Sequence, residues 1–118
     1  MSIERLYSGS QFSIYVLSHR KDDFIKFVNN LPERDKKKVF KLIERIGNYG
    51  VPINEEKFKQ LENGIFEMKP SSQIRIGCFF DKERKIIIIS AFIKKKGKTS
   101  KRFIEKFVKE MNDYFNQK

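Results

Sequence analysis

Apolar and polar residues recur along this chain with two different periods, and the changes of period divide it into predicted strands and helices. Residues 11–17 alternate with a period of two and end in the aliphatic pair Val16 and Leu17, which predicts a first strand. Residues 1–10 are interpreted as a loose lead-in or a weak extension of that strand. The chain therefore begins with extended structure.

Two segments follow in which the apolar residues have the spacing of an α-helix. Asp22 is suited to the N-cap of a short helix, whose apolar residues stand at positions 24, 27, 28 and 31. Pro32 fits the first position of a second helix, with an apolar stripe at positions 39, 42, 43, 46 and 49. Gly47, Gly50 and Pro52 are expected to end it. The cations of this helix are interpreted as a solvated face, with contact to nucleic acid as the alternative.

The second half of the chain predicts three strands and a helix. Residues 50–63 are interpreted as an irregular connection, and strands are expected over residues 65–69, 74–80 and 86–93. The isoleucine run at 86–89 is apolar on both faces, as in an inner strand that is covered on both sides. Residues 103–115 form an amphipathic helical pattern that continues to the C-terminal region.

The predicted order is β-α-α-β-β-β-α, which is an α+β fold in one domain covering residues 1–118. We expect a small, mainly antiparallel sheet of about four strands, packed with two N-terminal helices and a C-terminal helix. A domain of this length buries roughly two thirds of the surface of its unfolded chain, so a core is feasible without disulfides.

The net charge of the chain limits the classes of partner that it can be expected to bind. Lys and Arg number 26 against 15 Asp and Glu, a net charge of +11, and 14% of the residues are aromatic. This composition predicts a folded basic domain that binds nucleic acid, an anionic membrane surface or an acidic protein. The single cysteine, Cys78, fits a reducing compartment and a small buried position. No leader pattern or membrane-length apolar run is present, so we expect a cytoplasmic protein.

Three charged residues are predicted to share one face of the sheet. If the turn at residues 70–73 sets Lys69 opposite Arg75, then Glu67 falls opposite Gly77. The three side chains would then project together, over a glycine that leaves space for a ligand. The alternative is an ordinary exposed ion pair, which contributes little stability.

The densest cluster of positive charge follows the last predicted strand. Lys94, Lys95, Lys96 and Lys98 leave a rigid sheet rather than a tail, which favours contacts with phosphate over the alternative of a solvated loop. Other candidates for RNA binding are Lys57, Lys59 and Thr99. The site is predicted to bind nucleic acid.

Four segments in this order resemble the RelE/ParE superfamily of toxins from type II toxin–antitoxin modules. They are Gly64-Ile-Phe-Glu-Met-Lys69, Ile74-Arg-Ile, Ala91-Phe92-Ile-Lys-Lys95 and Lys98-Thr99, ahead of an amphipathic helix. The pattern is most similar to the HigB-like branch and its phage-borne relatives, with G-[LI]-[YWF]-E-[LM]-R, R-I-x-[YF]-F and F-x-K-K-[TS]-x-K-T-P. The similarity covers the chain from residue 57 onward.

The resemblance implies a RelE-like fold and an endoribonuclease that cleaves message on the ribosome. It also implies a cognate antitoxin, HigA-like and carrying a helix-turn-helix. Arg75, Lys94, Lys95, Lys98 and Thr99 match family positions directly. The chain departs from the pattern at four places, with lysine for arginine at 69, cysteine for an aromatic at 78, lysine for a hydroxyl residue at 96 and serine for proline at 100.

Cleavage without a metal needs a base for the ribose 2′-OH, an acid for the leaving oxygen and cations around the phosphate. The only histidine, His19, lies far away in sequence and is expected at the surface or at a cap. The base is then Glu67 or a lysine whose pKa is lowered by its neighbours, one of Lys69, Lys94 and Lys95, and Arg75 is suited to hold the phosphate.

The sequence predicts no metal, no nucleotide cofactor and no other small-molecule cofactor, because it has one histidine, one cysteine and no phosphate-binding glycine loop. Two alternatives to the ribonuclease remain open. One is a gyrase-poisoning toxin of the ParE type, which shares the fold. The other is a basic RNA-binding domain without catalytic activity.

Overall fold

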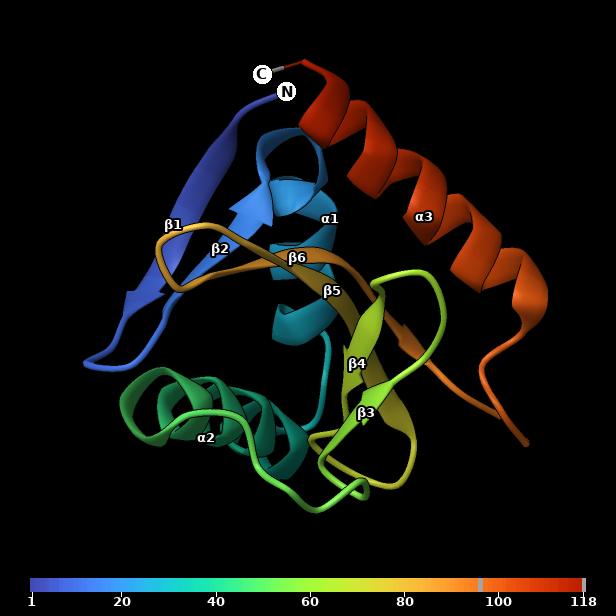
Figure 1. Ribbon diagram of the computed structural model, residues 1–118. Coiled ribbons are helices and arrows are strands. Elements are labelled where there is room, and N and C mark those ends of the chain that lie inside the picture. Colours follow the sequence, from blue (N-terminus) through green and yellow to red (C-terminus); the bar gives the residue numbers. More distant parts are fainter. Residues whose placement is uncertain (96, 118) are drawn as a thin grey trace.

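The computed structural model describes residues 1–95 and 97–117, and these residues form one six-stranded sheet with three α-helices around it (Figure 1). The spatial order of the strands is β1-β2-β6-β5-β4-β3. In chain order the elements are β1 (Ile3–Ser8), β2 (Ser13–Leu17), the 3-10 turn η1 (Ser18–Arg20), α1 (Lys21–Asn29), α2 (Glu33–Tyr49), β3 (Phe58–Gln60), β4 (Phe66–Met68), β5 (Ile74–Asp81), β6 (Lys85–Ile93) and α3 (Lys101–Asn116).

The sheet is mainly antiparallel, as predicted. The pair of β2 and β6 is parallel, and every other neighbouring pair is antiparallel. The side chains of Ile86 to Ile89 in β6 are fully buried. This confirms the prediction of an inner strand covered on both faces.

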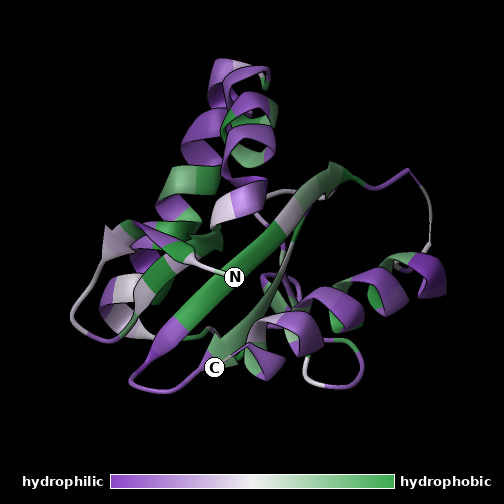
Figure 2. Cartoon of the chain, turned by 90° about the horizontal axis from the view of Figure 1, so that it is seen from above, coloured by the Kyte–Doolittle hydropathy of each residue, from purple (hydrophilic) through white to green (hydrophobic). Residues whose placement is uncertain are grey.

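The helices cover opposite faces of the sheet and create two cores. Helices α1 and α2 pack on one face, where Val39, Ile43 and Ile46 join Ile86 and Ile88. Helix α3 packs on the other face, through residues such as Phe107 and Tyr114. Figure 2 shows the central strands as hydrophobic and the outer surfaces of the helices as hydrophilic. None of the described helices is long and apolar enough to span a membrane.

Two strands were missed by the sequence prediction, which otherwise gave the correct fold class. The lead-in contains β1, and its register with β2 shifts between Arg5 and Tyr7, so its side chains do not alternate cleanly. The connection at 50–63 contains β3, which has three residues and pairs with β4. Strands this short or irregular carry no clear period-two signal. The sheet therefore has six described strands where about four were expected.

Three helix boundaries also differ from the prediction. Pro32 is the N-cap of α2 and not its first residue. Asp22 lies in the first turn of α1, which starts after Arg20, so it is not the N-cap. Gly47 lies inside α2 and does not end it. A Cβ atom at position 47 would lie 2.7 Å from the Tyr7 ring. The Gly47 carbonyl accepts hydrogen bonds from the backbone N–H groups of Gln11 and Phe12. This glycine therefore allows close packing of the β1–β2 turn on the helix.

A β-bulge in β6 decides which side chains face the candidate site. Gly77 pairs with Ser90 and Cys78 pairs with Ile88, so one residue of β6 is unpaired between them. Before the bulge, Ile88 faces the α1 and α2 side, whereas Phe92 beyond it faces α3. A shift of one residue moves every following side chain to the opposite face.

Candidate functional site

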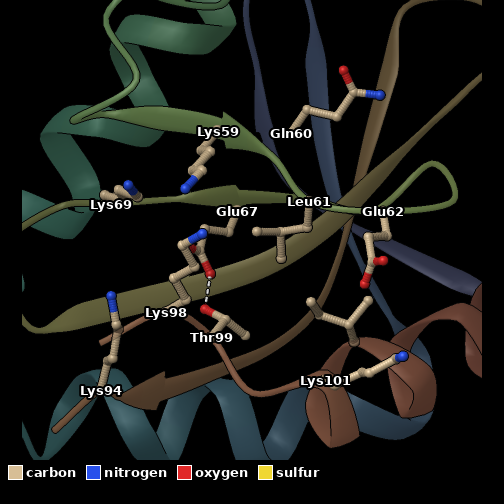
Figure 3. Close-up of a pocket in the computed structure, with 11 residues that line it drawn as sticks. Lys59, Gln60, Leu61, Glu62, Glu67, Lys69, Lys94, Lys98, Thr99 and Lys101 are labelled. Atoms are coloured by element: carbon tan, nitrogen blue, oxygen red, sulfur yellow. Dashed lines mark hydrogen bonds between the residues drawn. The ribbon is translucent and has the colours of Figure 1, made fainter. Parts of the chain in front are cut away.

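A hollow of about 380 Å³ opens between the end of the sheet and the start of α3 (Figure 3). Five cations line it, and Figure 3 shows the amino groups of Lys59 and Lys98 directed toward Glu67, whereas Lys101 points away from it. The lining residues are Lys59, Gln60, Leu61, Glu62, Glu67, Lys69, Lys94, Lys98, Thr99, Lys101 and Ile104. We call this space the site hollow.

Glu67 stands at the floor of the site hollow and is 2% exposed. It pairs with Lys59 on β3 and with Gly77 on β5, which confirms the predicted register of Glu67 opposite Gly77. The Thr99 hydroxyl donates a hydrogen bond to Glu67 Oε2. Thr99 is itself buried, so this bond connects the segment before α3 to the sheet. The carboxylate is held in a single position from two sides.

Arg75 lies beside Glu67 and is 6% exposed, so the pair is buried and is not the ordinary exposed ion pair of the alternative interpretation. Its Nε lies 3.5 Å from Glu67 Oε1. Its Nη1 donates to the backbone carbonyls of Ser71 and Ile74, both at 3.0 Å. Among the described residues, Arg75 Nε is the one buried side-chain polar atom without a hydrogen bond. The guanidinium therefore supports the turn at residues 70–73 and adds a fixed positive charge beneath the site.

The space above Gly77 does not belong to a ligand, contrary to our expectation. A Cβ atom at this position would lie 2.7 Å from the Phe107 ring. Phe107 belongs to α3 and is almost fully buried. The glycine lets α3 approach the sheet closely, because any larger side chain would displace this ring.

Lys69 follows β4 and faces both the site hollow and a neighbouring hollow that includes Arg75. Burial lowers the pKa of Lys69 below its ordinary value, and the positive charge of Arg75 lowers it further. Lys59 and Lys94 act in the same direction, and the negative charge of Glu67 opposes them. The surroundings of Lys69 therefore lower the pKa of this candidate base.

The lysine loop contributes unequally to the site. Lys94 and Lys98 line the site hollow, and the backbone N–H of Lys94 donates to the Gln73 carbonyl at 2.7 Å. Lys95 is exposed and lines none of the described hollows, and Lys96 lies outside the described residues. After the loop, the Ser100 hydroxyl accepts a hydrogen bond from the Phe103 N–H as the N-cap of α3.

The two remaining RNA-binding candidates, Lys57 and Lys59, lie in different hollows. Lys59 lines the site hollow, whereas Lys57 lines the neighbouring one. Five residues of the site hollow were not among the predicted site residues, namely Gln60, Leu61, Glu62, Lys101 and Ile104. Lys101 carried a usable signal, because it extends the run of cations, while the others are placed there by β3 and by the fold of α3.

The lone histidine and cysteine lie away from the site hollow. His19 is at the surface, as expected, and its Nε2 is 2.9 Å from Glu110 Oε1. Cys78 is fully buried in the core beneath α1 and α2, and this burial raises the pKa of its thiol. Among residues 1–95 and 97–117 there is no group of three or more His, Cys, Asp or Glu side chains that could hold a metal.

A family model that matches most of the sequence places the chain in a known family. Residues 26–112 match the model of the family described as phage-derived protein Gp49-like (DUF891), so the chain belongs to that family. No curated protein matches the chain.

A solved structure supports the fold independently. The chain is similar to a chain of the YoeB–YefM complex from Staphylococcus aureus, with a TM-score of 0.53 and 20% sequence identity. The similarity covers 75% of this chain and 100% of that chain. The two proteins therefore share an α+β fold, and the fold class predicted from the sequence is confirmed. Placement in the HigB-like branch stays a prediction.

Proposed function

We propose that this protein is the toxin of a type II toxin–antitoxin module and a metal-independent endoribonuclease that cleaves messenger RNA on the ribosome. The observation that carries the proposal is the convergence of Lys59, Lys69, Lys94 and Lys98 on one hollow around a buried carboxylate. Such a group of cations is suited to a phosphate whose negative charge increases during the reaction. The shared fold with the YoeB–YefM complex supports the same class of function.

In the proposed reaction, the ribose 2′-OH attacks the adjacent phosphorus and the bond to the 5′-oxygen breaks. The products are a 2′,3′-cyclic phosphate and a free 5′-OH. Lys69, in its neutral form, takes the proton of the 2′-OH, because its pKa is lowered toward the range where a base is effective. A protonated lysine, Lys94 or Lys98, gives a proton to the leaving oxygen.

Glu67 and Arg75 act in this proposal as positioning residues. Both are buried and contact each other, so neither can move far without breaking the sheet end. Arg75 keeps a permanent positive charge next to Lys69, and that charge favours the neutral form of the lysine. Glu67 fixes Thr99, and through it the segment that follows the lysine loop.

The departures from the resembled pattern are compatible with an active enzyme. Lysine at position 69 can lose its proton at a pH where arginine stays charged, so the replacement can supply a base. Cys78 faces the core on the other side of the sheet and does not line the site hollow. Ser100 caps α3 with its hydroxyl, which is a local structural function.

The partners proposed for this chain are messenger RNA, the ribosome and a cognate antitoxin of the HigA-like, helix-turn-helix type. The net charge of +11 favours both the RNA and an acidic protein segment. The YoeB–YefM structure is itself a complex of two proteins, which is consistent with a bound partner for this fold.

The test is induced expression of the wild-type chain and of Lys69→Gln and Lys94→Gln variants, with Lys82→Gln as the matched control. Lys82 is exposed in the turn between β5 and β6 and lines none of the described hollows. We expect growth arrest and cleaved message with the wild type and the control, and a loss of cleavage of about 10²–10⁴-fold in the Lys69 variant.

Primer extension on translated message locates the cuts, and analysis of the new ends detects the cyclic phosphate. Full toxicity in both site variants would refute the assignment of the site. Inhibited DNA supercoiling with intact message would instead favour the gyrase-directed alternative.

A further inference from the structure

Helix α2 carries a basic flank that the cleavage site does not use. Arg34, Lys38, Lys41 and Arg45 follow one another at i, i+4, i+7 and i+11, so they lie on the same side of the helix. All four are exposed, and Tyr49, 83% exposed, extends the same row by four residues. Glu33, Phe40 and Glu44 occupy the opposite flank. The two sides of this helix therefore differ in chemistry.

The basic flank is joined to the site hollow through two further hollows. Lys69 lines both the site hollow and the second one, which has a volume of about 550 Å³. Lys38, Lys57 and Pro70 line both the second hollow and a third of about 200 Å³. The third hollow is completed by Lys41, Leu42 and Arg45. The three hollows are therefore neighbours in a row that leads from the site to α2, and we call this row the basic track.

Positive charge along the basic track is not balanced within the protein. Within the part of the chain that the structure describes, Lys38, Lys41, Arg45 and Lys57 form no salt bridge. The only acidic residue that lines the second hollow is Glu56, and none lines the third. Like charges at this spacing repel one another, so the row favours an external polyanion.

We infer that the basic track binds the backbone of a single RNA strand whose scissile phosphate occupies the site hollow. This inference rests on the proposed function for the position of the cleaved bond. From Arg34 to Tyr49 the helix rises about 22 Å, which accommodates several nucleotides beyond that bond. Tyr49 offers an exposed ring on which a base can stack, and Leu42 and Pro70 add apolar contacts.

The same features argue against an acidic protein segment as the occupant. Protein partners are usually anchored by large apolar side chains in well-packed pockets. The apolar groove on this helix is lined by Leu6, Phe24, Ile25, Phe40 and Ile43, and so belongs to the opposite flank. The basic flank instead combines exposed cations with the exposed Tyr49 ring at the end of the row, which is the composition of a surface that binds single-stranded nucleic acid.

The test measures binding of fully 2′-O-methylated RNA, which lacks the attacking hydroxyl and is not cut. Fluorescence anisotropy is recorded over a series of KCl concentrations for a strand of about 20 nucleotides and for one of about 4. The track variant is Lys38→Gln with Lys41→Gln and Arg45→Gln. The charge-matched control is Lys26→Gln with Lys37→Gln and Lys82→Gln, three exposed lysines outside the described hollows.

We expect the track variant to reduce the slope of log K against log salt by about 2 for the long strand, since each lost phosphate contact contributes about 0.7. Binding of the short strand and the behaviour of the control should stay close to wild type. Tyr49→Ala should weaken binding of the long strand about tenfold without changing the slope, because stacking releases no counterions. Unchanged thermal unfolding confirms that each variant is folded.

Equal losses in the track variant and the control would overturn the inference, because net charge alone would then explain the binding. Unchanged binding in the track variant would overturn it as well. Poly-glutamate that binds as tightly as the long RNA, and that loses affinity in parallel, would assign the track to an acidic polypeptide. Failure of the cleavage proposal would instead appear as uncut message with these binding results intact.

Discussion

Two carboxylates in this molecule are each paired with an arginine, and they differ in how completely they are paired and in what surrounds them. Glu110 on α3 accepts hydrogen bonds from Arg20 Nε and Nη2, and His19 Nε2 lies 2.9 Å from its Oε1. Glu67 accepts from Thr99, while Arg75 Nε stays 3.5 Å away without a hydrogen bond. The first cluster is fully paired, and the second is not.

This difference indicates that the Glu110 cluster has a structural role, whereas the Glu67 cluster is suited to binding or chemistry. Burial alone raises the pKa of Glu110, but the hydrogen bonds and charges of Arg20 and His19 outweigh it and hold the pKa below its ordinary value. That cluster connects the turn after β2 to α3, and its residues line none of the described hollows. The Glu67 cluster opens on the site hollow, where five lysines face two glutamates. Unbalanced charge in a hollow marks function better than an ion pair does.

The largest effect is expected from Glu67→Gln. It leaves the Arg75 charge buried without a counterion, and breaking a buried pair from one side costs about 3–5 kcal/mol of unfolding free energy. Chemical denaturation measures this loss. The double variant Glu67→Gln with Arg75→Met should recover part of it, and a double variant no more stable than Glu67→Gln would argue that the pair is not the source of the stability.

A smaller effect is expected from Glu110→Gln, which removes a partly exposed ion pair and should cost about 1 kcal/mol. The folded-state pKa of Glu110 is lowered, so its contribution is present above the pKa of the unfolded chain and is lost as the pH falls. The difference in melting temperature between this variant and the wild type should therefore shrink in acid. RNA cleavage should be unchanged. A difference that grows in acid would contradict the sign of the pKa shift.

The smallest effect is expected from Lys59→Gln, measured as the pH dependence of the cleavage rate. Lys59 lowers the pKa of Lys69, so its removal should move the rising limb of the profile to higher pH. The maximal rate at high pH should change little. Lys26→Gln, on α1 and outside the site hollow, is the matched control and should leave the profile in place. A limb that does not move would argue against Lys69 as the base.

Much of the fold could be predicted because its signals are local. The apolar stripe of α2 and the apolar run of β6 each lie within one short stretch of the sequence, and both elements appear as expected. The strands β1 and β3 could not be found, because they are short or irregular and are stabilised by pairing with the strand that follows each of them. Local periodicity carries no information about a partner strand.

The candidate site could be predicted in part. The turn assumed at residues 70–73 correctly set Glu67 opposite Gly77, and Lys94, a candidate because of its position after the last predicted strand, lines the site hollow. The burial of Arg75 and its bonds to the carbonyls of the turn could not be foreseen. They depend on the conformation of the turn at residues 70–73, which brings the Ser71 carbonyl within 3.0 Å of Arg75 Nη1.

The amino-acid sequence by itself determined the class of fold, the positive charge and the order of the site segments, since these follow from composition and local period. Tertiary structure alone decided where the charges meet. One unpaired residue in β6 turns Phe92 to the face of α3, on the side where Lys94 lines the site hollow. The ring of Phe107 fills the space over Gly77 that a ligand was expected to occupy. Both outcomes arise from the packing of α3 and the strands against one another, which no local pattern encodes.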